Sequence, residues 1–309
     1  MNAKITISGF TDEYSESLDD QIKLLKKINE HYMCPRVIDH KNIANYTYEE
    51  FIQNIKPRLD KENIKFSSIG SPIGKIDIDD EEGFIRQKNQ LKELVKIAKA
   101  MNTKYIRIFS FYYGNRNPED IFEKVVSKLK EFLDIAKGTG VVLMHENEKL
   151  IYGDISDRCL KLYNALKDDG LVLCYDASNY IQCDEDPLDA FNKTYMYTKY
   201  IHVKDCSKWK VEVPLTFGLA RYDEVIKRLD EIGYEGFMTL EPHTWKYAEW
   251  KERIYSLKTR NEDEENHYQA FKMIDKKLGV SEKRIFSREE MYLMQYKYLR
   301  GLIYLYENR

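Results

Sequence analysis

The sequence predicts a (β/α)8 barrel over residues 1–250, followed by a C-terminal helical extension over residues 251–309. Eight short β-rich runs alternate with longer stretches of helical periodicity, which is typical of parallel strands joined by helices. The runs end about 33 residues apart on average, the length of one strand-plus-helix unit. Eight such units close a barrel, and 309 residues suit a single barrel domain. The predicted strands are residues 4–10, 33–39, 64–70, 104–111, 141–146, 171–176, 199–205 and 236–242.

The stretches between these runs carry apolar residues at spacings of three and four, as on one face of a helix. Two examples are the sets Leu18, Ile22, Leu25, Ile28 and Ile121, Val125, Leu129, Phe132. Thr47 and Glu50 predict a capping box at the start of one helix, and Gly233 predicts the end of another. An open doubly wound sheet is the competing architecture, but no GxGxxG motif follows the first predicted strand.

The pattern changes after Glu241. Residues 259–267 are strongly charged and predict a solvated helix face or a loop. Residues 287–309 are helical in pattern and rich in tyrosine and methionine. Two interpretations of this last helix stay open, because it can pack on the barrel or form the contact of a homodimer.

Composition excludes several classes of partner. The formal net charge is −3, without the basic excess that nucleic acid or an anionic membrane attracts. No stretch approaches the roughly 18 consecutive apolar residues of a membrane span, and the first residues read as a strand rather than a signal peptide. The five cysteines are odd in number and form no CxxC pair, which favours a reduced, cytoplasmic setting.

Ionisable side chains end the last four predicted strands. Because side chains alternate along a strand, the inward-facing position nearest each strand end can be read directly from the sequence. These positions hold Glu146, Asp176, His202 and Glu241. Active sites of such barrels lie at the C-terminal ends of the strands, so we expect the four side chains to converge there.

A convergence of three carboxylates and an imidazole predicts a bound divalent cation. Without compensation, such a group of charges is very costly to bury. The oxygen-rich set suits Mn2+ best among the candidates, with Mg2+, Co2+ and Zn2+ as alternatives. A single strand-end carboxylate more often caps a helix, and a single strand histidine is usually a core group. Four such residues on successive strands favour the metal interpretation.

Several short runs, taken in order, resemble the sugar phosphate isomerase/epimerase family, the xylose isomerase-like TIM barrels. They include SGFTDE near the start, RVIDHKNI, SPIGK and RIFSFY, and they continue with HEN at 145–147, DxxN at 176–179, HVKD at 202–205 and LEPH at 240–243. The resemblance covers roughly residues 1–245. It implies one divalent metal ion held by Glu146, Asp176, His202 and Glu241. It also implies isomerisation or epimerisation of a sugar or sugar phosphate.

The chemistry of these residue types agrees with that implication. A divalent cation polarises a carbonyl and stabilises an enediolate. Glu146 and Glu241 are the expected catalytic residues, one removing the proton next to the carbonyl and the other returning it. The sequence does not distinguish which glutamate acts first.

Four further residues are candidates for substrate binding. Lys204 shares the inward face of His202, and Arg36 ends the second predicted strand. Either side chain can contact substrate or form an ion pair within the protein. Asn179 stands where ketose epimerases of the family commonly have a histidine, and an amide cannot take a proton. His243 follows Glu241 by two residues and lies either beside the site or in a surface loop.

Alternative functions use the same barrel. A polyol or sugar-acid dehydratase begins with the same proton removal, and the sequence does not separate it from an isomerase. A non-catalytic sugar-binding barrel would keep the four metal-binding side chains but would catalyse no reaction. A DNA-repair nuclease with three zinc ions needs many more histidines than the six present, and acidic composition opposes DNA binding.

Overall fold

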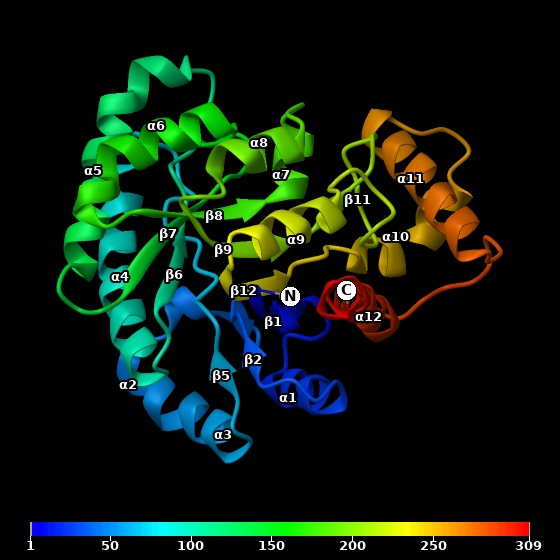
Figure 1. Ribbon diagram of the computed structural model, residues 1–309, viewed down its shortest axis with the longest axis horizontal. Coiled ribbons are helices and arrows are strands. Elements are labelled where there is room, and N and C mark those ends of the chain that lie inside the picture. The colour runs from blue at the N-terminus through cyan, green and yellow to red at the C-terminus, as the bar shows by residue number, and fades with distance from the viewer. Residues whose placement is uncertain (1, 309) are drawn as a thin grey trace.

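The computed structural model describes residues 2–308, and its centre is a parallel sheet (Figure 1). Six strands are hydrogen-bonded in the order β1-β12-β9-β8-β7-β6, and all their pairings are parallel. Their bounds are β1 Lys4–Gly9, β6 Tyr105–Ile108, β7 Val142–Glu146, β8 Val172–Asp176, β9 Thr198–Val203 and β12 Glu235–Leu240.

Two short strands close the sheet into a barrel. β2 (Tyr32–Met33) pairs in parallel with β5 (Lys65–Phe66). The Cys34 N–H donates to the Gly9 carbonyl at 2.9 Å, which joins the β2 side to β1. The Arg107 N–H donates to the Ile69 carbonyl at 2.9 Å, which joins the β5 side to β6. The eight predicted runs therefore form one closed circuit, and the predicted fold class is confirmed.

The second predicted strand is shorter than the sequence indicates. Only its first residue, Met33, lies in β2, and the chain then turns into an antiparallel hairpin of β3 (Val37–Ile38) and β4 (Lys41–Asn42). Pro35 lies between these elements and has no N–H to donate to a neighbouring strand. The apolar pair of the hairpin continues the β-rich pattern beyond the barrel strand.

Helices surround the strands, as expected from the apolar spacing. They are α1 Leu18–Lys27, α2 Tyr48–Glu50, α3 Lys56–Lys61, α4 Glu81–Ala100, α5 Phe122–Ala136, α6 Ser156–Leu166, α7 Ala177–Gln182, α8 Pro187–Thr194, α9 Tyr222–Glu231, α10 Trp245–Ser256, α11 Glu262–Leu278 and α12 Arg288–Glu307. Another short hairpin, β10 (Asp205–Cys206) with β11 (Glu212–Val213), follows β9. No helix among residues 2–308 combines the length and apolar character that crossing a bilayer requires.

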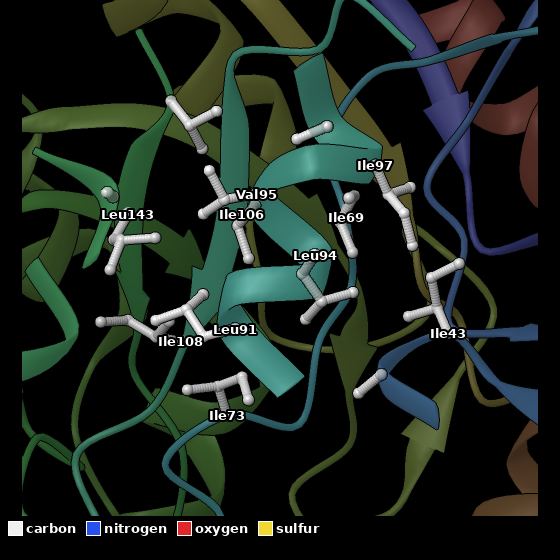
Figure 2. Packing of buried hydrophobic residues seen from close by; sticks show 14 of the residues in the cluster. Ile43, Ile69, Ile73, Leu91, Leu94, Val95, Ile97, Ile106, Ile108 and Leu143 are labelled. Carbon is white, nitrogen blue, oxygen red and sulfur yellow. The ribbon is translucent and has the colours of Figure 1, made fainter. Parts of the chain in front are cut away.

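Alternation along β6 decides which side chains reach the interior. Ile106 and Ile108 are fully buried outside the barrel wall, where they pack with Leu91 and Leu94 of α4 (Figure 2). The residue between the two isoleucines is Arg107, which points to the other face of the strand. A well-packed outer layer thus fixes an arginine in the barrel interior.

The last helix lies against the barrel rather than away from it. The Tyr296 hydroxyl of α12 donates to the Ile28 carbonyl at the end of α1, and the Tyr306 hydroxyl donates to the Asp223 carbonyl in α9. Leu299 and Ile303 are fully buried in a cluster that includes residues of β1 and β12. Helix α11 lies farther out, at the right-hand edge of Figure 1. The division at residue 250 stays a prediction.

A candidate metal centre at the mouth of the barrel

Four neighbouring strands, β12, β9, β8 and β7, bring the expected residues together at their C-terminal ends. Glu146 ends β7, Asp176 ends β8, His202 lies in β9, and Glu241 directly follows β12. One donor atom from each side chain lies within 4.8 Å of every other. All four side chains are at most 5% exposed. Inward-facing positions at the ends of neighbouring strands therefore bring these four side chains into a compact, buried group.

His202 is the centre of this group. Its Nδ1 lies 2.7 Å from Glu146 Oε1 and 3.2 Å from Glu241 Oε2. The imidazole ring is held at its edges by Phe10, 5.1 Å away between ring centres, and by Tyr200, 5.6 Å away. These aromatic contacts fix the orientation of the ring. In this orientation Nδ1 points toward both glutamate side chains.

Asp176 lies at the start of α7 and is held there by hydrogen bonds with Asn147 and Asn179. Its Oδ1 accepts the Asn179 N–H at 3.0 Å, as the residue preceding a helix commonly does. The Asp176 backbone is paired with the side chain of Asn147, and the Asn179 side-chain amide donates to the Asn147 carbonyl at 2.8 Å. Asn179 thus connects two site loops. The remaining oxygen, Asp176 Oδ2, lies 2.9 Å from Lys204 Nζ.

Arg107 spans the two glutamates. Its Nη1 lies 3.1 Å from Glu146 Oε2 and 3.4 Å from Glu241 Oε1. The guanidinium also donates to the Gly70 carbonyl at 3.1 Å and lies about 5 Å from the ring centres of Phe10 and Phe109. A planar cation with several fixed donors suits such a bridge better than a lysine does.

A second arginine contacts the same oxygen of Glu241 that Arg107 contacts. Arg36 Nη1 lies 3.1 Å from Glu241 Oε1, while its remaining nitrogens contact Asp12 Oδ2 at 2.7 Å and Glu13 Oε1 at 2.8 Å. Both acids belong to the short helix Thr11–Glu13 that follows β1. His243 Nδ1 lies 2.9 Å from the same Glu13 oxygen, and its Nε2 lies 3.9 Å from Glu241 Oε1.

Two half-buried ion pairs form the rim above this group. Lys75 Nζ lies 2.7 Å from Glu148 Oε2, and Lys246 Nζ lies 2.9 Å from Glu212 Oε2. Burial by itself would lower the pKa of Lys204, but Asp176, Glu241 and Glu148 hold it well above its ordinary value. Glu148 therefore acts on the interior of the site as well as on Lys75.

The carboxylates of the site outnumber the permanent cations that contact them by two. The carboxylates are those of Asp12, Glu13, Glu146, Asp176 and Glu241, and the cations are Arg36, Arg107 and Lys204. The pKa of His202 is also held well above its ordinary value against the effect of burial, partly by Glu146, and a protonated His202 reduces the excess to one. Within residues 2–308, Asp176 Oδ2 and Glu241 Oε2 are buried and accept no well-oriented hydrogen bond, although Lys204 Nζ lies 2.9 Å from the first and His202 Nδ1 lies 3.2 Å from the second. Unbalanced buried charge is very costly. The side chains present therefore fit a divalent cation, which would balance the charge and use these oxygens.

The same imbalance changes how readily individual carboxyl groups ionise. Burial raises the pKa of Asp176 to about 7, although Lys204 opposes the shift. Burial likewise raises the pKa of Asp12 to about 6 against the effect of Arg36. Burial also acts on Glu146, but His202 and Arg107 outweigh it and lower the pKa of this group to about 2. A nearby cation would favour the ionised form of all three.

The sequence located some of this arrangement and missed the rest. The structure brings together Glu146, Asp176, His202 and Glu241, and it places Lys204, Arg36 and His243 beside them. Arg107, Asp12 and Glu13 were not among the predicted site residues. Strand alternation could have identified Arg107, because it lies between two outward isoleucines. The two acids follow a strand in a short turn, where no periodicity indicates direction.

Comparison with known proteins agrees with this fold. The family model described as xylose isomerase-like TIM barrel matches residues 32–270. The chain belongs to this family. The resemblance that the short sequence runs indicated is thereby confirmed. Among curated proteins, none matches the sequence significantly.

Solved structures of several family members share the fold at low identity. A xylose isomerase-like TIM barrel protein from Mycobacterium smegmatis, in complex with magnesium, is 16% identical, with a TM-score of 0.62 over 89% of this chain and 97% of that one. A D-psicose 3-epimerase from Clostridium cellulolyticum H10, solved with D-tagatose, is 14% identical, with a TM-score of 0.65 over 96% and 99%. A probable 3-DHS dehydratase from Bacillus anthracis is 15% identical, with a TM-score of 0.62 over 77% and 93%.

Proposed function

We propose that this protein is a divalent-metal-dependent isomerase or epimerase of a sugar or sugar phosphate, acting by proton transfer through an enediolate. The observation that carries the proposal is the buried group of Glu146, Asp176, His202 and Glu241, whose donor atoms lie within 4.8 Å of one another. Membership of a family that includes sugar epimerases supports the reaction class.

Glu146, Asp176, His202 and Glu241 would hold the ion. A bound divalent ion supplies polarisation of a carbonyl and stabilisation of negative charge. Mn2+ is our first choice because the donor set is hard and oxygen-rich, with Mg2+, Co2+ or Zn2+ as alternatives. Magnesium in the Mycobacterium smegmatis relative supports a divalent ion without selecting among these.

Glu146 and Glu241 are proposed as the proton-transfer pair. They lie on either side of His202 Nδ1, and both contact Arg107. One carboxylate would accept the proton on the carbon next to the carbonyl, and the other would donate a proton at the neighbouring carbon or on the opposite face. Arg107 would orient both carboxylates, and the low exposure of the whole group would exclude water from the transfer.

The remaining candidates are assigned by their place in the site. Lys204, with its ammonium 2.9 Å from Asp176 Oδ2, is proposed to donate to a substrate oxygen. Arg36 and His243 flank Glu241 from the more exposed side and are proposed to contact substrate there. Asn179 is proposed to act mainly on the loop of Asp176, through its bond to the Asn147 carbonyl.

A dehydratase is the second candidate, because the Bacillus anthracis relative is described as a probable 3-DHS dehydratase and shares the fold. Both reactions begin with the same proton removal, so they differ only in whether a hydroxyl is then lost. A sugar-binding barrel without turnover is the third candidate. A reduced, cytoplasmic setting is proposed from the five cysteines, all of which are unpaired.

The first experiment measures bound metal by elemental mass spectrometry in untagged protein and in an Asp176→Ala variant. The proposal predicts about one divalent ion per chain, lost in the variant. The loaded protein is then incubated with ketoses and ketose phosphates in heavy water. Solvent deuterium in recovered sugar supports an isomerase or epimerase, whereas loss of a hydroxyl indicates a dehydratase. Absence of metal after incubation with Mn2+, Co2+ and Zn2+ would refute the proposal, and three zinc ions would favour a nuclease.

A further inference from the structure

Each buried or half-buried cation that surrounds the candidate metal centre is already paired with a carboxylate. Among residues 2–308, Arg36, Arg107 and Lys204 in the interior all contact acids of the site. At the rim, Lys75 and Lys246 are paired with acids of their own. The buried and half-buried positive charge around the centre is therefore engaged in ion pairs before any substrate arrives.

The rim pair of Lys75 and Glu148 connects two loops that are far apart in the sequence. Lys75 follows the third barrel strand and Glu148 follows β7, with 2.7 Å between Nζ and Oε2. The Glu148 side chain is 16% exposed, and Lys75 Nζ also lies 4.2 Å from the centre of the Phe109 ring. An aromatic face and an acid therefore both hold this ammonium group.

The opposite rim pair is more deeply buried. The Glu212 side chain is 8% exposed, and Lys246 Nζ lies 2.9 Å from its Oε2. Gln182 donates to the other oxygen of Glu212 at 3.0 Å, so the carboxylate is fully engaged. Each rim lysine would therefore have to separate from its own acid before it could neutralise a new anion.

From this arrangement we infer that the substrate is an uncharged sugar rather than a sugar phosphate. The inference rests on the proposed function and specifies the substrate class of the same site. A sugar hydroxyl both donates and accepts hydrogen bonds, so it can join an existing ammonium–carboxylate pair without separating its charges. A ring or chain of hydroxyl groups thus suits a rim of closed ion pairs.

A phosphate group makes the opposite demand. It carries nearly two negative charges at neutral pH and takes its strongest hydrogen bonds from cations such as arginine and lysine. At this rim the phosphate would lie next to Glu148 or Glu212, and like charges placed together at an interface oppose binding. Glu148 and Glu212 are therefore assigned as the residues that discriminate against phosphorylated sugars.

The test compares matched pairs of ligands on the Mn2+-loaded 309-residue protein. Calorimetry measures the binding of ketohexoses, ketopentoses and their terminal phosphate esters, and deuterium exchange measures turnover of the same compounds. We expect the free sugar of the accepted pair to bind at least about tenfold more tightly than its phosphate ester. A phosphate ester that binds as tightly as the free sugar, or more tightly, overturns the inference.

A charge-matched pair of variants tests the cause of the discrimination. Glu148→Gln releases Lys75 and should reduce the preference for the free sugar about tenfold. Glu131→Gln removes an acid that pairs with Lys88 on the outer helices, at 2.8 Å, and should leave the preference unchanged. An unchanged preference in Glu148→Gln contradicts the assignment of the rim acid.

A wrong substrate class and a wrong function would give different results in these measurements. If phosphate esters bind and exchange deuterium better than free sugars, the inference on substrate class is wrong and the proposed isomerase function stands. If no sugar and no sugar phosphate binds or exchanges deuterium in the metal-loaded protein, the proposed function fails and the inference fails with it.

Discussion

Arg107 Nη1 lies 3.1 Å from Glu146 Oε2 in the barrel interior, where the two side chains are 5% and 2% exposed. Burial opposes the charge on this guanidinium, but Glu146 and Glu241 keep its pKa above the ordinary value. A buried arginine is therefore part of the same charge system as the candidate ligands. Any change to it alters both the stability of the barrel and the position of the two glutamates.

Replacing Arg107 with methionine should destabilise the metal-free protein strongly. Removing one partner of a buried ion pair leaves an uncompensated charge and costs about 3–5 kcal/mol. Urea denaturation in EDTA measures this loss, and added Mn2+ should restore part of it, because a divalent cation would compensate the glutamates. Arg116→Met, which removes an exposed ion pair with Asp77, is the control and should have a much smaller effect. Equal unfolding midpoints for the two variants would contradict the buried role of Arg107.

Strand alternation explains why the four residues of the candidate metal centre could be predicted from sequence. Residues at the ends of buried parallel strands have only two directions, and the apolar residues of each strand identify the outward one. His202 lies between Ile201 and Val203, both of which are buried outside the barrel wall. The same rule applies to Arg107, whose position between the outward Ile106 and Ile108 predicts that its side chain faces the interior.

Loops and long-range pairs were beyond the reach of this rule. Asp12 and Glu13 lie in a turn, and the pair of Lys75 and Glu148 joins loops separated by 73 residues. Which loop side chains meet depends on the curvature of the closed barrel, and no local spacing records it. The predicted length of the second strand was wrong for a different reason. Its apolar pattern continues past Pro35 into the hairpin of β3 and β4.

Metal binding should increase the free energy of unfolding in a way that depends on Asp176. A ligand that binds only the folded state stabilises it by about 2.7 kcal/mol at a concentration of one hundred times Kd. Thermal unfolding across a Mn2+ titration should therefore give a rising Tm for the unmodified protein. Asp176→Asn keeps the helix-capping oxygen but weakens the ligand, so the rise should be lost. The same rise in the variant would show that the ion binds elsewhere.

His145 should make stability depend on pH between about 4 and 6.5. This fully buried imidazole has a pKa lowered to about 4 by burial, and its Nε2 lies 2.9 Å from Ser110 Oγ. In the unfolded chain the group binds a proton below about pH 6.5. Because the unfolded state then holds more protons than the folded state, stability should fall as pH decreases through this interval.

Subtracting a His145→Gln variant isolates that contribution. The free energy of unfolding, measured by urea denaturation from pH 4 to pH 7, should fall by about 3 kcal/mol more in the unmodified protein than in the variant. Comparing slopes removes the contribution of the carboxylates, which titrate in both proteins. Parallel curves would mean that His145 is accessible to protons in the folded state.

The position of α12 predicts that the C-terminal residues unfold together with the barrel. Leu299 is fully buried against residues of the barrel strands, whereas Leu305 on the same helix is 58% exposed. Leu299→Ala should cost about 2–5 kcal/mol by leaving a cavity, and Leu305→Ala should cost far less. Denaturation followed both by tryptophan fluorescence and by circular dichroism should give one coincident transition in each variant. Two separate transitions would instead indicate that residues 251–309 fold independently. A midpoint that rises with protein concentration and falls in Leu305→Ala would place this helix in a homodimer contact.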